Sequence, residues 1–400
     1  MSRYNLAWIL GITAISLFGF TIVTGAPSRE EEKNYELVAL IVDVLEEVDS
    51  RYVNKLTPER KRELVEDMLN GGLERLDPHS AFINNKELRQ FNRQSEGKFG
   101  GIGIQIGYDR NKTGRLMVIS PMPGTPAYNA GVLAGDLILK VDGKSTEGMR
   151  LSEAVELIQG KLGDPVTLTV RHETGKTEDI KITRAIIKVK SVLGDLRKKD
   201  HPEEWELLID PKDKIGYLRL TQFNKTATDE MKAAIEELKS RGMKGLVIDL
   251  RGNPGGLLKS AIEITDMFID QGMIVSTKGR NHKEEKYEAK ASTSILGPNS
   301  NVKVAILINR YSASASEIFS AALQDHGRAV IVGERSYGKG SVQNIIPLEK
   351  STSALKLTTA SYWRPSGKNI HRFPESKETD EWGVTPSKGF KVKLSEKERI

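Results

Sequence analysis

The last part of the chain, residues 189–400, alternates strand-like and helix-like segments, and this alternation limits the folds that it can adopt. Apolar runs typical of strands lie at residues 215–220, 245–251, 302–308 and 328–333, and helical runs lie at 229–241, 257–269 and 314–324. Strands and helices in this order form layered α/β structure, with functional loops beyond the strand ends. We therefore expect an α/β core over residues 189–400, with any chemistry in its loops.

A β-rich unit at residues 96–188 precedes this core. It contains a glycine-rich turn at 99–106, a run at 135–143 that ends in a Val-Asp-Gly turn, a helix at 151–158 and a strand at 166–171. This order resembles a PDZ domain, in which an extended peptide adds to a strand while amides of the glycine turn hold its terminal carboxylate. The resemblance implies that Gly101, Ile102, Gly103 and Ile104 bind the peptide. The alternative is that these glycines only form a turn.

Residues 29–95 are predicted to be an N-terminal helical segment. Apolar residues recur at spacings of three and four between positions 34 and 48, and Thr57 with Pro58 marks the start of a second helix that runs towards Leu73. The pair is either a satellite of the core or a dimerisation arm, and we favour dimerisation. The sequence then leaves the helix at residues 76–80, where we interpret His79 as a structural turn residue and not as a catalytic one.

The first 28 residues are typical of an export signal. Arg3 precedes an apolar stretch that runs from Leu6 to Val23, and small residues follow it. The stretch is 18 residues long, so an uncleaved membrane anchor is equally consistent with it. We expect an exported protein of the bacterial cell envelope, in the periplasm, either released by cleavage or anchored to the inner membrane.

Composition excludes several kinds of site. The 400 residues include no cysteine, which rules out disulfides, thiolate metal sites and a cysteine nucleophile, and only six histidines. The net charge of +6 is small and scattered, and no basic stripe with aromatic residues indicates a nucleic-acid partner. The charged stretches 188–214 and 278–290 are interpreted as a linker or exposed hairpin and as solvated surface. We expect no metal and no organic cofactor.

Ser314 is the candidate nucleophile, because it lies where an apolar strand gives way to an Ala-rich helix. The first N–H groups of a helix lack internal partners, so the amide of Ala315 is available to stabilise an oxyanion. The turn at residues 253–256, with Gly255 and Gly256, is the second place that offers such donors. Ser312 and Ser316 are the neighbouring hydroxyls, and a capping role suits either of them.

Lys339 is the candidate base, since a desolvated lysine is one of the few alternatives to histidine. A lysine with an ordinary pKa of about 10.4 is only about 0.1% neutral at pH 7.5, so this role requires burial. Gln343, four residues later, is placed to hold the amine through its side chain.

Two competing interpretations are weaker. Residues 333–339 fit the start of a P-loop, but Gly340 stands where a hydroxyl must bind magnesium, and a strand follows in place of a helix. Asp325 and His326 follow the Ser314 helix, but adjacent residues do not orient one another as a catalytic triad requires.

Several motifs, in one order, together resemble the carboxy-terminal processing (tail-specific) peptidases. They are the strand 245–251 with Asn253-Pro254-Gly255-Gly256, the serine run 312–317, Gly333-Glu334, Gly338-Lys339-Gly340 and Val342-Gln343, with residues 76–80 and the PDZ unit upstream. The resemblance implies a crotonase-like α/β protease core with Ser314 as nucleophile, Lys339 as general base and Gln343 assisting it. It also implies an oxyanion hole from Ala315 and the Gly255–Gly256 turn. Gly252 and Arg364 depart mildly from the family pattern.

We therefore predict an α+β or α/β multidomain serine endopeptidase that binds the apolar C-terminal tails of protein substrates through its PDZ domain, which also gates activity. A homo-oligomer, an adaptor protein and membrane association through the N-terminus are the partners that this organisation allows. The alternative from another class is a non-catalytic PDZ scaffold that binds peptide tails.

Overall fold

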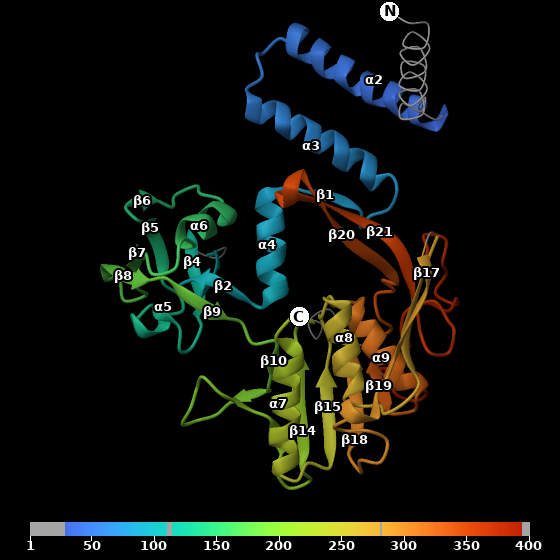
Figure 1. Cartoon of the computed structure of the whole chain (residues 1–400). Coiled ribbons are helices and arrows are strands. Elements are labelled where there is room, and N and C mark those ends of the chain that lie inside the picture. Colours follow the sequence, from blue (N-terminus) through green and yellow to red (C-terminus); the bar gives the residue numbers. More distant parts are fainter. Residues whose placement is uncertain (1–28, 110–113, 281, 394–400) are drawn as a thin grey trace, which may run out of the picture. The chain divides into compact units, whose positions relative to one another are not determined.

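The computed structural model describes residues 29–109, 114–280 and 282–393. These form two compact units, whose boundary in the sequence falls between Gly71 and Gly72 (Figure 1). The predicted signal or anchor at residues 1–28 lies outside the described residues. Within the described ranges, none of the helices combines the length and the apolar content that a membrane-spanning segment needs.

The first unit contains the two helices that the apolar spacing predicts, α2 (Arg29–Arg51) and α3 (Pro58–Glu74). Thr57 caps α3, because its Oγ1 accepts a hydrogen bond from the Arg60 N–H at 3.2 Å. On α2, Leu37 and Leu40 are 61% and 59% exposed. Within this unit, α3 therefore leaves these two side chains largely uncovered.

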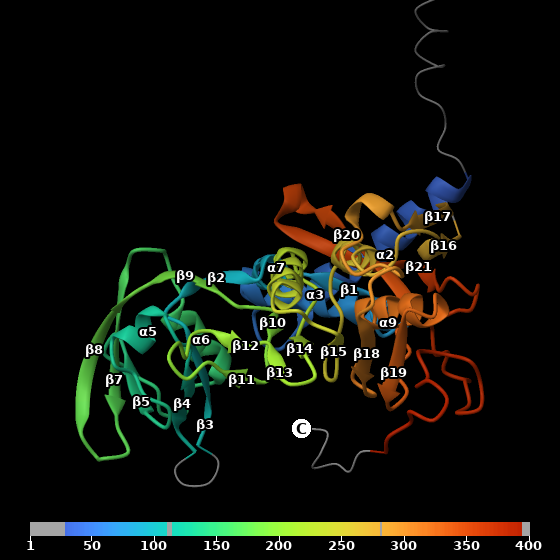
Figure 2. The same ribbon diagram turned by 90° about the horizontal axis from the view of Figure 1, so that it is seen from below.

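A mainly parallel sheet forms the base of the α/β core, as the alternation predicts (Figure 2). Its parallel strands are, in spatial order, β14 (Ile215–Leu220), β15 (Gly245–Asp249), β18 (Lys303–Ile308) and β19 (Ala329–Gly333), and the short strands β10 (Val192–Leu193) and β13 (Leu208–Asp210) pair antiparallel with β14. Asp249 at the end of β15 is the register partner of Leu307 on β18. The loops that carry Gly255 and Ser314 therefore leave the sheet from neighbouring strand ends.

Three helices pack on this sheet: α7 (Ala227–Ser240), α8 (Leu258–Asp266) and α9 (Ala315–Asp325). Phe223, Phe268 and Phe319 are fully buried between them, and the Phe319 ring centroid lies 5.5 Å from that of Phe268 and 6.3 Å from that of Phe223. Burial of each such ring contributes about 1.5–3 kcal/mol. The helix that begins directly after Ser314 is thus anchored in the core.

A second sheet, which the sequence analysis did not predict as a whole, completes the core. Its strands are β1 (Ala81–Ile83), β16 (Met273–Gly279), β17 (His282–Glu288), β20 (Ser341–Leu348) and β21 (Ser353–Trp363), with the short 3-10 turns η1 (Ala291–Thr293) and η2 (Glu349–Ser351) in its connections. The charged stretch 278–290 contains edge strand β17, whose side chains at 283–286 are exposed, as solvated surface should be. Strand β1 pairs with β21, so the turn at residues 76–80 joins the core although it lies within the predicted N-terminal segment.

The PDZ unit is a separate antiparallel sheet with its own core of Val118, Ile138 and Leu168, all fully buried. Its strands lie in the order β3 (Ile104–Tyr108), β4 (Leu116–Pro121), β5 (Leu137–Val141), β7 (Pro165–Arg171) and β8 (Thr177–Thr183), with β6 (Lys144–Ser145) on β5 and the helices α5 (Pro126–Asn129) and α6 (Leu151–Ile158). Strand β3 is therefore at an edge of the sheet.

Short elements connect these parts. They are α4 (Asn85–Glu96), the strand pair β2 (Lys98–Gly101) and β9 (Ala185–Lys188), and the hairpin β11 (Leu196–Arg197) and β12 (Trp205–Glu206). Asn84 and Glu87 form a reciprocal capping box that starts α4. The hairpin occupies the charged stretch for which a linker or an exposed hairpin was expected.

Candidate active site

Ser314 occupies a strained turn between β18 and α9. Its φ and ψ are +55° and −113°, outside the regions that a residue with a Cβ normally adopts. The residue is 8% exposed and directly precedes the first helical residue, Ala315. Strain of this kind persists only where the surroundings impose it, and it is concentrated at functional sites.

The two neighbouring serines have structural partners. Ser312 Oγ donates to the carbonyl oxygen of Leu250 at 2.7 Å, and Ser316 Oγ donates to that of Asn253 at 3.1 Å. Both hydroxyls therefore tie the Ser314 turn to the neighbouring loop after β15. This assigns Ser312 and Ser316 a structural role and leaves Ser314 as the candidate nucleophile of the run.

Glu317 connects the Ser314 turn to the loop that carries Lys339, and the sequence analysis missed this residue. Its Oε2 accepts the amide N–H of Ser314 and that of Lys339, both at 2.8 Å, and its Oε1 accepts Ser336 Oγ at 2.5 Å and the Gly338 N–H at 2.7 Å. Burial raises the pKa of Glu317 to about 6, against these hydrogen bonds, which favour the ionised form. A glutamate three residues after a helix-capping serine is the sequence signal that could have identified it.

Lys339 lies on the segment between β19 and β20 and is partly buried. Burial lowers the pKa of Lys339, and the positive charge of Lys356 lowers it further, while Glu317 and Asp77 act in the opposite direction. Among the described residues, no hydrogen bond joins the Lys339 side chain to Ser314 or to Gln343. The backbone of Lys339 is nevertheless fixed to the Ser314 turn through Glu317.

Gln343 lies on β20, and its amide nitrogen is hydrogen-bonded to neighbouring hydroxyls of the second sheet. Its Nε2 donates to Ser341 Oγ at 2.9 Å and to Thr358 Oγ1 at 3.2 Å. Thr358 in turn donates to Asp77 Oδ1 at 3.0 Å. Asp77 and Thr358 were not predicted as site residues, because the hydrogen bonds that link Asp77 to Thr358 and Thr358 to Gln343 depend on the pairing of β1, β20 and β21.

The glycine turn after β15 touches the nucleophile turn directly. A Cβ placed on Gly255 would lie 2.7 Å from the Ala313 oxygen, 2.8 Å from the Ala315 nitrogen and 2.9 Å from Ser314 Cβ. The Gly255 N–H donates to Asn253 Oδ1 at 2.8 Å. Within the described part of the chain, the N–H groups of Gly256 and Ala315 have no acceptor, so these two donors are available near Ser314.

An ion pair at the end of β15 supports this glycine turn. Asp249 is 1% exposed and accepts two close contacts from Arg251 Nε, at 2.9 and 3.1 Å, and one from Nη2 at 2.7 Å. Burial alone would raise the pKa of Asp249, but the hydrogen bonds from Arg251 and Tyr217 outweigh it and lower the pKa. The carboxylate therefore stays ionised and holds the strand end in place.

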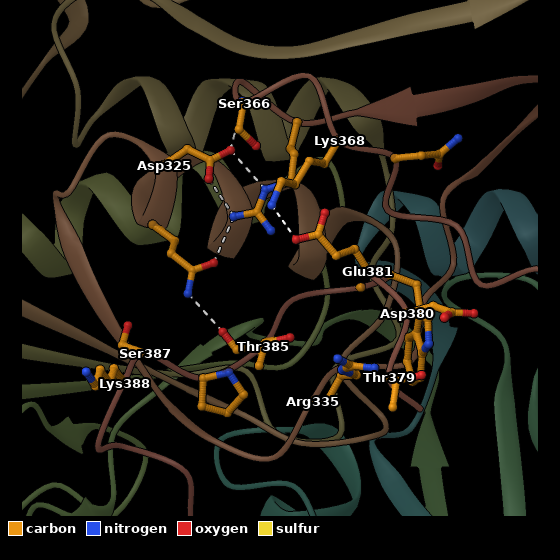
Figure 3. A pocket seen from close by; sticks show the side chains of 16 residues that line it. Asp325, Arg335, Ser366, Lys368, Thr379, Asp380, Glu381, Thr385, Ser387 and Lys388 are labelled. Atoms are coloured by element: carbon orange, nitrogen blue, oxygen red, sulfur yellow. Dashed lines mark hydrogen bonds and ion pairs between the residues drawn. The ribbon is translucent and has the colours of Figure 1, made fainter. Parts of the chain in front are cut away.

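The competing interpretations do not fit the geometry. Asp325 pairs with Arg364, at 2.6 Å between Oδ1 and Nη2, at the rim of a cavity of about 480 Å³ (Figure 3). His326 Nε2 lies 2.8 Å from the Met273 carbonyl oxygen, so the carboxylate of Asp325 does not orient this imidazole. Segment 341–348 is strand β20, which leaves no helix to complete a P-loop. Neither Ser314 nor Lys339 lines the cavity of Figure 3.

His79 lies in the turn before β1. The backbone N–H of His79 donates to Asp77 Oδ1 at 2.8 Å, which agrees with the structural role expected for this turn residue. Burial lowers the pKa of His79, and the charge of Lys339 lowers it further. No group of three or more acidic, histidine or cysteine side chains in the described ranges could hold a metal ion.

The predicted peptide-binding residues of the PDZ unit lie together where β2 gives way to β3. Ile102 is buried, and its carbonyl oxygen accepts the Ala127 N–H at 2.9 Å. Gly103 has a φ of +80°, and a Cβ there would lie 2.3 Å from Thr125 Cβ, so only glycine fits. The edge position of β3, which begins at Ile104, leaves one side of the strand unpaired within the described sheet.

Comparisons with known proteins agree with this architecture. The family model for peptidase family S41 matches residues 214–386, and a PDZ domain model matches residues 117–172. The chain is 41% identical over 393 residues to a carboxy-terminal-processing protease of Bartonella bacilliformis, covering 93% of this chain and 81% of that protein. It is 32% identical over 377 residues to the carboxy-terminal processing protease CtpA of Bacillus subtilis, covering 92% and 75%. Among solved structures, a photosystem II D1 C-terminal processing protease is similar at a TM-score of 0.47 and 28% identity, covering 87% of this chain and 86% of that one.

Proposed function

Because this chain belongs to peptidase family S41, as a serine-type carboxy-terminal processing protease with a PDZ domain, we propose that it cleaves peptide bonds with a Ser314–Lys339 dyad. The observation that carries the proposal is the shared carboxylate of Glu317, which accepts the amides of both residues at 2.8 Å. A nucleophile and its base must be held in fixed geometry, and a common buried anchor does this.

The chemistry follows from these positions. Ser314 Oγ attacks the scissile carbonyl carbon while the neutral amine of Lys339 takes the hydroxyl proton, and the carbonyl electrons move onto the oxyanion. The amides of Ala315 and Gly256 stabilise that oxyanion, since the Gly255 N–H already donates to Asn253 Oδ1. Lys339 then protonates the leaving amine, which gives an acyl-enzyme. Attack by water, with Lys339 again as base, releases the new carboxylate and restores Ser314.

Gln343 assists by fixing the amine of Lys339. Burial is what makes this lysine a base, because it lowers the pKa of the ammonium group. Glu317 and Asp77 oppose this effect. A neighbouring amide that keeps the amine aimed at Ser314 supports the general-base role.

The PDZ unit supplies substrate choice. The free edge of β3 and the glycine turn from Gly101 to Ile104 suit β-augmentation by an extended, apolar C-terminal tail. Tail binding also gates the enzyme by ordering the Lys339–Gln343 segment, a population shift that requires the tail to bind the ordered state more tightly.

We further propose that the protein forms a homo-oligomer and acts in the cell envelope. The apolar side of α2, with Leu37 and Leu40 exposed, is a surface that a second copy of the chain would cover. We place the enzyme in the cell envelope, exported through residues 1–28 and either cleaved there or anchored to the inner membrane, where an adaptor protein is a further partner.

The test is an incubation of residues 29–400 with a folded protein that ends in an apolar tail, followed by mass spectrometry of the fragments. We expect cleavage by the parent and a loss of about 1,000-fold or more in Ser314→Ala and Lys339→Ala, with unchanged melting temperatures. Cleavage retained in Lys339→Ala would remove the dyad. Tail binding without fragments in the parent would favour the PDZ scaffold.

A further inference from the structure

A chain of hydrogen bonds joins Asp77 to Gln343 through the hydroxyl of Thr358. Thr358 Oγ1 lies 3.0 Å from Asp77 Oδ1 and 3.2 Å from Gln343 Nε2. Gln343 and Thr358 are register partners on the antiparallel strands β20 and β21, so their side chains stand on the same face of the sheet. The contact is therefore built into the strand pairing.

Asp77 acts only as an acceptor in this series of hydrogen bonds. Its Oδ1 also accepts the N–H groups of His79 and Ser80, at 2.8 and 3.0 Å, and its Oδ2 accepts Ser80 Oγ at 2.6 Å. Burial alone would raise the pKa of Asp77, but the hydrogen bonds from Ser80, His79 and Thr358 outweigh it and lower the pKa. An ionised carboxylate has no proton to donate.

The charge of Asp77 therefore decides which group is the donor and which the acceptor in each hydrogen bond between Asp77, Thr358 and Gln343. Thr358 has one hydroxyl hydrogen and must give it to Asp77, so its oxygen is left to accept. Gln343 must then present its NH₂ group to Thr358, and the second amide hydrogen points to Ser341 Oγ at 2.9 Å. Both amide hydrogens are engaged with these two hydroxyls, and only the amide oxygen is left to accept from another donor.

We propose that Asp77 and Thr358 are positioning residues that fix the amide of Gln343 with its oxygen presented to the amine of Lys339. The inference deepens the proposed function and rests on it. An amide oxygen accepts an N–H from the lysine and leaves the nitrogen lone pair free for the Ser314 proton. A flipped amide would donate to that lone pair and compete with the nucleophile for the base.

Thr358→Val is the direct test, because it keeps the size of the side chain and removes its hydroxyl, while Thr358→Ser keeps the hydroxyl. We expect kcat to fall about tenfold in Thr358→Val, the rate equivalent of one hydrogen bond of about 1.4 kcal/mol, with KM little changed. Thr358→Ser should restore kcat. The matched comparison separates the hydroxyl from the shape of the residue.

A double-mutant cycle shows whether Thr358 acts through Gln343. On the alkaline plateau, where Lys339 is neutral, Thr358→Val should have no further effect in a Gln343→Ala background. Asp77→Ala should behave in the same way, because it removes the carboxylate to which Thr358 donates and so frees the Thr358 hydroxyl to turn towards Gln343. It serves as the second variant if Thr358→Val does not fold.

The pH profile gives a readout that a purely structural role would not move. A fixed amide oxygen stabilises the ammonium form of Lys339, so Thr358→Val should shift the acid limb of kcat/KM to lower pH. The other charged groups that act on Lys339 or on its partners remain in place in this variant: Lys356 on β21, Glu317 on α9, Asp77 and His79 before β1, and His371.

The outcomes separate this inference from the dyad itself. Full activity and an unmoved acid limb in both Thr358→Val and Asp77→Ala would overturn the positioning role, and so would an equal loss with and without Gln343. Neither result would affect the dyad if Lys339→Ala remains inactive. An active Lys339→Ala would instead remove the proposed function and this inference with it.

Discussion

Ser314 and Lys339 donate their backbone amides to the same oxygen atom, Glu317 Oε2, each at 2.8 Å. The carboxylate is fully buried, and its other oxygen holds Ser336 and Gly338. The Ser314 turn and the Lys339 loop therefore share one anchor.

Glu317→Gln should weaken both the fold and the activity, because an amide turns its NH₂ group towards N–H donors that then lack an acceptor. Each unsatisfied buried donor costs about 1–3 kcal/mol. We expect the free energy of unfolding in urea to fall by at least that amount, with a large loss of kcat. Glu236→Gln on the exposed side of α7 is the matched control and should change neither quantity. An unaltered kcat in Glu317→Gln would show that the anchor has no catalytic consequence.

Lys356→Gln should make the enzyme more sensitive to acid. The positive charge of Lys356, after burial, is a cause of the lowered pKa of Lys339. Its removal lets that pKa rise, so a smaller fraction of Lys339 is neutral at a given pH. The acid limb of kcat/KM should move to higher pH, and Lys356→Arg, which keeps the charge, should leave it in place. A limb that does not move in Lys356→Gln would contradict this account of Lys339.

Gly255→Ala should abolish activity, since its Cβ would lie within 3 Å of three atoms of the nucleophile turn, as the distances of 2.7, 2.8 and 2.9 Å show. Displacement of oxyanion donors costs about 100-fold or more in kcat. Gly252→Asn is the control, because Gly252 has a φ of +73° with no atom within 4 Å of a Cβ, and asparagine tolerates this conformation. Peptidase assays of both variants check the prediction, and comparable activities would contradict it.

Arg364→Ala should destabilise the end of α9. Arg364 and Asp325 have side chains that are only 11% and 14% exposed, and loss of one partner of such a pair costs about 3 kcal/mol. Lys368→Ala breaks the exposed Glu381 pair of the same cavity and should cost less than about 1 kcal/mol (Figure 3). Urea unfolding of the two variants measures this difference.

The contribution of the Arg364–Asp325 ion pair to the stability of the fold should depend on pH. Burial would raise the pKa of Asp325, but the hydrogen bonds from Arg364 and Ser366 lower it. Its contribution to stability is therefore present above the ordinary aspartate pKa and is lost as the pH falls through the folded value. This acid sensitivity should be weaker in Arg364→Ala. Equal dependence in parent and variant would assign it to other groups.

Sequence patterns alone predicted the parallel layer well. The segments 215–220, 245–251 and 328–333 correspond to β14, β15 and β19, and helix 151–158 coincides with α6. Strands buried on both faces and amphipathic helices have local periodicities, so their existence can be inferred without the fold. The family assignment from the Ser314, Lys339 and PDZ motifs is confirmed by the matches to peptidase family S41 and to a PDZ domain.

The second sheet could not be predicted in this way. Strands β17 and β21 are largely polar or only half-buried along their length, so they lack the apolar signal of a core strand. The pairing of β1 with β21 joins segments that are far apart in the chain, which no local pattern encodes. The hydrogen bonds from Gln343 to Thr358 and from Thr358 to Asp77 depend on such pairings and were therefore not predicted.

The sequence by itself determined the candidates for the chemistry, since a chain without cysteine that places Ser314 at a strand-to-helix turn and Lys339 beside glycines has few other nucleophile and base pairs. The tertiary structure decided what surrounds them: the burial that lowers the pKa of Lys339, the Glu317 carboxylate between the two loops, and the hydroxyl that faces Gln343. Residue type and local spacing set reactivity, but desolvation and hydrogen-bond direction depend on groups that only the folded chain brings together.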